Sequence, residues 1–206
     1  MSFHLWLTFV AAATVLLMIP GPTILLVISY ALTQGRRVAL AMALGVALGD
    51  FIAMSASLLG LGALVLASAE LFTMLKWVGA IYLVWMGIKL LRSPPVAADV
   101  EAPAPKEARA IFAHAATVTA LNPKSIAFFI AFVPQFLSLD APLPGQFATL
   151  IATFVSLATL NALGYALLAD RLRARIRRPA VLKWMNRAGG SALIGMGALT
   201  AGLARG

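Results

Sequence analysis

Two ionisable residues, Asp50 and Lys124, lie deep inside long apolar stretches of this sequence. A carboxylate in the middle of a membrane helix costs roughly 2.5–3.5 kcal/mol, so it should face the interior of a helix bundle. Burial favours the neutral carboxyl, which makes proton exchange feasible. We therefore expect Asp50 to carry a coupling proton or to bind an amine. The alternative is a structural carboxyl that pairs with Lys124 or stays neutral and hydrogen-bonded.

Lys124 is the only basic residue deep in an apolar stretch. Its ammonium could attract a substrate carboxylate or pair with Asp50 when the site is empty. It could also extend along the helix to the membrane surface. Its central position favours the interior of the bundle.

Proline interrupts two apolar stretches at matching places in the two halves of the chain. The two breaks are Pro20-Gly21-Pro22 and Asn122-Pro123-Lys124. Proline removes a backbone donor and clashes with the preceding turn, so other groups must satisfy the freed carbonyls. Interrupted helices at corresponding positions of two halves indicate a transport site near the middle of the bilayer.

Each break starts a new half-helix, whose free N–H groups and dipole favour an anionic group. Thr23 and Ser125 add hydroxyls just after the two breaks. We expect the carboxylate of an amino acid to meet one of these N-termini while its amine meets Asp50. The alternative is a pair of proline kinks that only shape the bundle.

Other polar residues in the apolar stretches are Tyr82, Asn161 and Tyr165. Each could line a pathway or make a hydrogen bond between helices. The sequence has no cysteine, and His4 and His114 lie near the ends of their stretches, on opposite faces of the membrane. We therefore expect no catalytic residues, no metal site and no cofactor.

The elements that position these residues are long apolar helices. The sequence is 62% hydrophobic with a mean hydropathy of +0.95, which is too apolar for a soluble domain. Six segments approach or exceed the roughly 20 residues that span a bilayer. They are Leu5–Leu32, Val38–Leu66, Leu71–Leu91, Ile111–Leu137, Gln146–Leu168 and Ala188–Leu203.

Charge distribution predicts the orientation. The net charge of +9 could suggest a nucleic-acid partner. However, the basic residues sit mainly in the first, third and fifth short loops between apolar segments, which argues against nucleic acid. Basic loops stay in the cytoplasm, so both termini are predicted to be periplasmic.

The chain is expected to form one membrane domain, residues 1–206, built from two three-helix repeats. Residues 1–92 form the first repeat, 93–110 a cytoplasmic linker rich in Pro and Ala, and 111–206 the second repeat. Three helices is an odd number, so the repeats should be inverted. The pairs Phe9 and Phe112, and Thr14 and Thr117, precede the two breaks at equal spacing.

Glycines should let the helices pack closely. Gly45 and Gly49 form a small-xxx-small face, and Gly79 and Gly87 are expected to act in the same way.

Taken together, these motifs resemble the lysine exporter superfamily, specifically its RhtB (homoserine/threonine efflux) branch. The resemblance covers nearly the whole chain and rests on the order of the two breaks, Gly35 with Arg37, Gly45 with Gly49-Asp50, Lys76–Leu83 with Gly87, and Pro134-Gln135-Phe136. It implies a bacterial inner-membrane protein that exports amino acids or close derivatives, driven by the proton gradient. Thr23 replaces the Asn or Asp common in the family, which could alter substrate choice, and Ala39 replaces a common glycine.

We therefore predict a proton-coupled efflux permease that works by alternating access, with threonine or homoserine as favoured types of substrate. Its partners would be the amino acid, protons and the lipid bilayer. Close-packed glycine faces would also permit a homo-oligomer. The alternatives are an exporter of metal ions or other metabolites, an intramembrane enzyme, or a structural membrane protein.

Overall fold

The computed structural model describes residues 1–19, 21–93, 107–138, 141–176 and 179–203. Every element in these ranges is helical. The α-helices are α1 (Phe3–Met18), α2 (Pro22–Gln34), α3 (Ala39–Ala67), α4 (Ala69–Arg92), α5 (Ala108–Ala120), α6 (Pro123–Ala131), α7 (Leu143–Ile176) and α8 (Pro179–Leu203), and the short 3₁₀ helices are η1 (Gly35–Val38) and η2 (Val133–Phe136).

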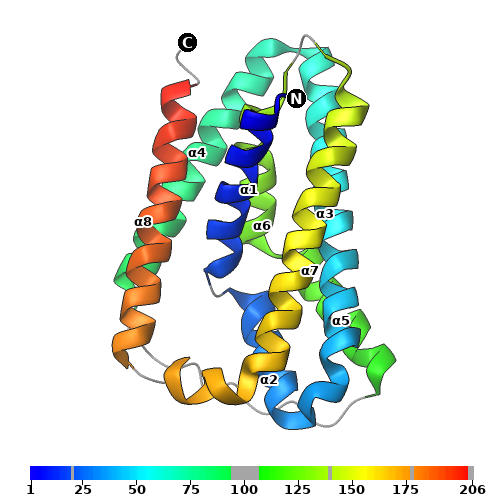
Figure 1. Cartoon of the computed structure of the whole chain (residues 1–206). Helices are drawn as coiled ribbons and strands as arrows, with labels where there is room; N and C mark the ends of the chain where they lie inside the picture. The colour runs from blue at the N-terminus through cyan, green and yellow to red at the C-terminus, as the bar shows by residue number, and fades with distance from the viewer. Residues whose placement is uncertain (20, 94–106, 139–140, 177–178, 204–206) are drawn as a thin grey trace.

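The helices form an elongated bundle (Figure 1). The start of α1 and the end of α8 lie at the same end of this bundle, and the turn from α2 to α3 lies at the other. Three stretches of the described chain are long and apolar enough to cross a membrane, namely Pro22–Leu64, Thr73–Arg92 and Leu143–Ala169. The all-helical membrane fold expected from the sequence is therefore confirmed, whereas the division into six spans and two inverted repeats stays a prediction.

Both predicted breaks interrupt helices. The first separates α1 from α2, and the second separates α5 from α6. Thr14 and Thr117 lie in corresponding turns before the two breaks, and each hydroxyl donates to the carbonyl four residues earlier, at 2.7 and 2.9 Å. Such bonds often bend a helix. This shared local feature agrees with the correspondence between Thr14 and Thr117 in the sequence.

The four predicted glycines lie at close helix contacts. A Cβ at Gly45 or Gly49 would lie 2.5 Å from a backbone carbonyl oxygen of α5. Gly87 meets the backbone of α8 in the same way, and Gly79 meets Ala131 of α6. Because backbones can approach this closely only where no side chain intervenes, the glycines determine which helix faces pack together.

An aromatic cluster fills the core beside the breaks. Phe9 of α1 packs against Phe128 and Phe136, and Phe154 of α7 packs edge-on against Phe129 at 4.8 Å between ring centroids. All five side chains are buried. The interior around α6 is therefore well packed and apolar, so polar groups there must find partners.

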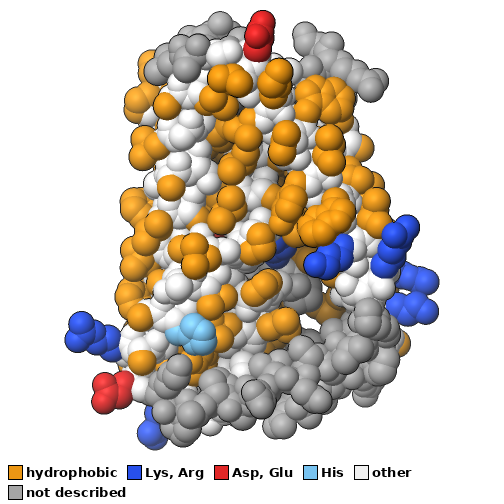
Figure 2. Space-filling model, turned by 180° about the vertical axis from the view of Figure 1, so that it is seen from behind, with side chains coloured by type: hydrophobic (Ala, Val, Ile, Leu, Met, Phe, Trp, Pro, Cys, Tyr) orange, Lys and Arg blue, Asp and Glu red, His pale blue; other side chains and the backbone are white. Residues whose placement is uncertain are grey.

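The outer surface is largely apolar. Large hydrophobic side chains are exposed along α1, α3, α4, α7 and α8. Figure 2 shows them over most of the height of one face, with Lys and Arg from about mid-height downward. An apolar band of this extent suits contact with lipid.

Two parts of the predicted layout differ or lie outside the structure. The fifth loop was expected to run from the end of span Gln146–Leu168 to Ala188, but α7 continues to Ile176 and α8 begins at Pro179. A helix need not end where its apolar segment ends, because Arg, Ala and Leu all favour helix. Most of the predicted linker, residues 94–106, lies outside the described residues.

Candidate functional site

The C-terminal end of α1 lies at the centre of the site. Helix α1 stops before the first break, so its last carbonyls lack the N–H groups of a following helical turn, although the Ile19 N–H donates to the Leu16 carbonyl. Side chains from the second half of the chain donate to four consecutive carbonyls. Lys124 donates to Leu16 and Ile19, Asn161 to Leu17, and Tyr165 to Met18.

Lys124 makes the closest of these contacts. Its Nζ lies 3.1 Å from the carbonyl oxygen of Leu16 and 2.7 Å from that of Ile19. A cation at a helix C-terminus also interacts favourably with the helix dipole. The same Nζ approaches Gly21, where an added Cβ would lie 3.4 Å away. Lys124 thus sits between the end of α1 and the start of α2.

Polar side chains join the two breaks. The Asn122 amide donates to the hydroxyl of Thr23 at 3.1 Å, and the Thr119 hydroxyl lies within 3.4 Å of the same oxygen. All three side chains are buried. Residues about 100 positions apart in the sequence therefore meet at one point, which places the breaks against one another. Thr119 was not among the predicted site residues. Its position one turn before the second break is the feature of the sequence that could have indicated it.

The two half-helix N-termini differ in how they are capped. At α6, the Asn122 side chain accepts a hydrogen bond from the Lys124 N–H at 3.1 Å. At α2, the N-cap is Gly21, and no side chain in the described chain caps the helix. Because glycine offers no acceptor and Pro22 has no N–H, the N–H groups of Thr23 and Ile24 lack a capping group. The start of α2 is thus the less satisfied of the two.

Asp50 is buried on α3, with 3% of its surface exposed. Lys124 is its charged neighbour, but no ion pair within 4.0 Å joins the two in the described chain. None of the hydrogen bonds found among the described residues reaches the Asp50 carboxyl. This matters because buried polar groups are normally hydrogen-bonded, and an exception calls for an explanation.

Other predicted site residues lie at the margin of this cluster or away from it. Ser125 is buried in the first turn of α6, and Pro20 lies outside the described residues. Tyr82 and the exposed Pro123 instead line a separate, mainly apolar pocket of about 310 Å³ between α4 and α6. Tyr82 also stacks at an angle on Trp85, 5.4 Å between centroids. It therefore does not join the groups at the breaks.

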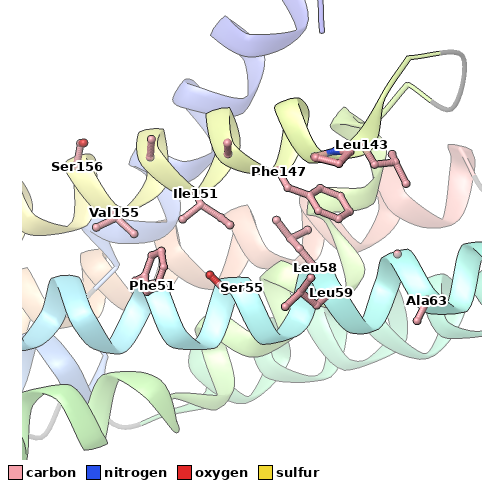
Figure 3. Close-up of a pocket in the computed structure, with 14 residues that line it drawn as sticks. Phe51, Ser55, Leu58, Leu59, Ala63, Leu143, Phe147, Ile151, Val155 and Ser156 are labelled. Carbon is pink, nitrogen blue, oxygen red and sulfur yellow. The ribbon is translucent and has the colours of Figure 1, made fainter.

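A larger groove of about 980 Å³ runs between α3 and α7 (Figure 3). Phe51, Leu58, Phe147 and Ile151 contribute to its mainly apolar lining, and no charged residue is among the groups that line it. Its described lining therefore offers no charged side chain to a charged or zwitterionic ligand. The polar contacts at the breaks form the candidate site instead.

Comparison with known proteins identifies the family of this chain. The family model described as "LysE type translocator" matches residues 14–202, which include both breaks, Asp50 and Lys124. The chain belongs to the LysE type translocator family. It is therefore a multi-pass membrane transporter and not an enzyme.

Several relatives in this family align over most of the chain. An "Uncharacterized membrane protein" of Vibrio cholerae is 36% identical, and a "Homoserine/homoserine lactone efflux protein" of Salmonella typhimurium is 35% identical, each over 98% of both chains. A "Leucine efflux protein" of Klebsiella pneumoniae is 30% identical over 78% of this chain and 74% of its own length. These names are consistent with the RhtB branch. No solved structure matches the chain.

Proposed function

We propose that this LysE-type translocator exports an amino acid or a close derivative across the bacterial inner membrane, in exchange for protons. Small neutral or hydroxylated amino acids, of the threonine or homoserine type, are the favoured substrates. The efflux activities in the names of two relatives support amino-acid export. The observation that carries the proposal is the meeting of both breaks beside the buried Asp50 carboxyl.

In this proposal the substrate carboxylate binds at the start of α2. No side chain of the described residues caps the N–H groups of Thr23 and Ile24, and the helix dipole there favours an anion. Lys124 uses two of its three N–H donors on the carbonyls of α1, so a third is left for a carboxylate near Gly21. The capped α6 N-terminus supports the site without binding the substrate.

Asp50 is the proposed acidic group for the substrate ammonium and for the coupling proton. No hydrogen bond among the described residues reaches this buried carboxyl, so it can accept either one. Binding of a proton and of the ammonium would then be mutually exclusive at this group. Competition of this kind is the simplest physical basis for exchange of one against the other.

The test is amino-acid flux in proteoliposomes under an imposed pH gradient. A panel of neutral, hydroxylated and basic amino acids is compared for the unmodified protein and Asp50→Asn. We expect gradient-driven flux of a small neutral amino acid, and loss of proton-coupled flux in Asp50→Asn. Glu70→Gln is the matched control, because Glu70 is exposed in the first turn of α4, and it should transport normally.

The outcomes separate the parts of the proposal. If correctly oriented protein moves no amino acid, amino-acid export is wrong, and metal ions and other metabolites become the next substrates to test. If flux persists under the gradient in Asp50→Asn, export stands but Asp50 is not the coupling group.

A further inference from the structure

A tyrosine and a histidine outside the candidate site join the two halves of the chain. The hydroxyl of Tyr30 on α2 lies 2.9 Å from Nδ1 of His114 on α5, and the rings meet edge-on. Tyr30 is completely buried, whereas His114 is partly exposed. A buried tyrosine hydroxyl normally requires a partner, so the bond satisfies a group that water does not reach.

The position of this contact is informative. Helix α2 runs from the breaks toward η1, which carries Arg36 and Arg37, and α5 runs from that same end of the bundle back to the breaks. The two helices meet at two levels: Thr23 meets α5 and α6 at the breaks, and Tyr30 meets α5 two turns, or about 10 Å, away. The Tyr30–His114 contact therefore lies between the candidate site and the basic end of the bundle.

A second contact between the halves lies toward the opposite end. The indole N–H of Trp6, in the first turns of α1, donates to the hydroxyl of Thr153 on α7 at 3.0 Å. Both side chains are partly exposed. In the described part of the chain, a hydrogen bond between side chains thus ties the halves on each side of the breaks.

We propose that Tyr30 and His114 form the cytoplasmic gate contact of this transporter. They hold α2 against α5 while the path from the basic end to the site is closed, and they separate when that path opens. The Trp6–Thr153 contact acts in the same way at the outer end. Both pairs are positioning residues, since they act through the helices that carry the site.

This gate presupposes the proposed export, together with the alternating access and orientation predicted from the sequence, but it does not depend on the identity of the substrate. An exporter must open to the cytoplasm once in each cycle, and we expect motion of one half against the other to part α2 from α5 at this end. A single hydrogen bond of this kind changes an equilibrium by about two- to tenfold. Loss of the bond should therefore shift the population toward the inward-open form by that factor.

The experiment measures access to the site with a single introduced thiol. The sequence contains no cysteine, so Ser125→Cys provides a unique, nearly isosteric reporter at a buried position just after the second break. A membrane-impermeant thiosulfonate reagent is applied to one face of sealed vesicles of known orientation. The labelling rate is compared among variants that carry this reporter.

Two variants remove the contact and two serve as controls. Tyr30→Phe keeps the ring and loses the hydroxyl, and His114→Leu removes the partner of that hydroxyl. His114→Asn is the rescue variant, because the asparagine side-chain amide can accept or donate a hydrogen bond in place of the imidazole Nδ1. Thr33→Val removes a hydroxyl from the same helix that bonds only to carbonyls within α2.

We expect labelling from the cytoplasmic face to rise about two- to tenfold in Tyr30→Phe and His114→Leu. His114→Asn and Thr33→Val should label at the rate of the reporter protein, and Trp6→Phe should raise labelling from the outer face only.

Equal rates in all variants, including no labelling in any, would overturn the proposal. So would a rise confined to the outer face in Tyr30→Phe. If one of the two disrupting variants does not fold, the labelling rate of the other is compared with that of His114→Asn, and this comparison decides. Because no transport is measured, failure here is distinct from failure of amino-acid export.

Discussion

Substitution of Gly49 by alanine tests the close contact between α3 and α5. A Cβ at this position would lie 2.5 Å from the carbonyl oxygen of Ala116 and 2.7 Å from the Cβ of Thr119. Neither atom belongs to the free end of a flexible side chain, so the two helices must move apart. Overpacking of this kind typically costs about 1–3 kcal/mol.

The same helix provides a matched control. Gly60 also lies in α3, but an added Cβ there would meet nothing within 4 Å. Both substitutions gain the helix propensity of alanine over glycine, about 1 kcal/mol, so the comparison of Gly49→Ala with Gly60→Ala cancels this gain. The difference between the two variants isolates the cost of separating α3 from α5.

We expect Gly49→Ala to be about 1–3 kcal/mol less stable than Gly60→Ala, or about 2–12 °C lower in unfolding temperature for a chain of this size. Thermal unfolding of both variants in the same detergent, followed by circular dichroism, measures this difference. Asp50 is the next residue after Gly49, so transport by Gly49→Ala should fall as well. Equal unfolding temperatures for the two variants would refute the inference that the glycine face holds α3 against α5.

Two further predictions concern stability. Lys124→Met should lower the free energy of unfolding by about 1–3 kcal/mol, because it removes both Lys124 bonds to the α1 carbonyls. Denaturant unfolding measures this loss, with Arg37→Met as the control because Arg37 is exposed. Equal losses of unfolding free energy in the two variants would contradict the prediction. Gln146→Leu should speed amide hydrogen exchange at Ser138, because the buried Gln146 side chain accepts from the Ser138 N–H and donates to its carbonyl, both at 2.8 Å. Hydrogen exchange measured by mass spectrometry checks this. Unchanged protection would show that the Gln146 side chain does not hold the backbone at Ser138.

The features that could be predicted from the sequence are local or compositional. Proline has no N–H, so a break near Pro22 and Pro123 follows from covalent structure, and helices start at both. Gly45 and Gly49 were predicted to allow close packing because they share one helix face, and they do so against α5. The apolar composition likewise predicted an all-helical membrane fold.

For other residues the sequence left two or more roles open, and the choice between them depends on residues that are distant in the chain. Lys124 could have paired with Asp50, but its ammonium donates to the carbonyls of α1. Asn161 and Tyr165 could have lined a pathway or joined helices, and both donate to the end of α1. Tyr82 has a similar mid-helix position in the sequence, yet it lines a separate pocket with Pro123. Hydropathy and spacing do not distinguish these cases, because they say which residues are polar but not which helix lies opposite.

The sequence by itself determined where the helices break, which faces can pack closely, and that the chain lies in a membrane. These properties follow from backbone chemistry and from the cost of placing polar groups in lipid, both of which act within a single helix. Only the tertiary structure decided which groups meet at the breaks and that Tyr30 faces His114, 84 residues away. Such contacts depend on how the helices cross. A freed carbonyl or a buried hydroxyl must be satisfied, but packing alone selects the donor or acceptor that reaches it.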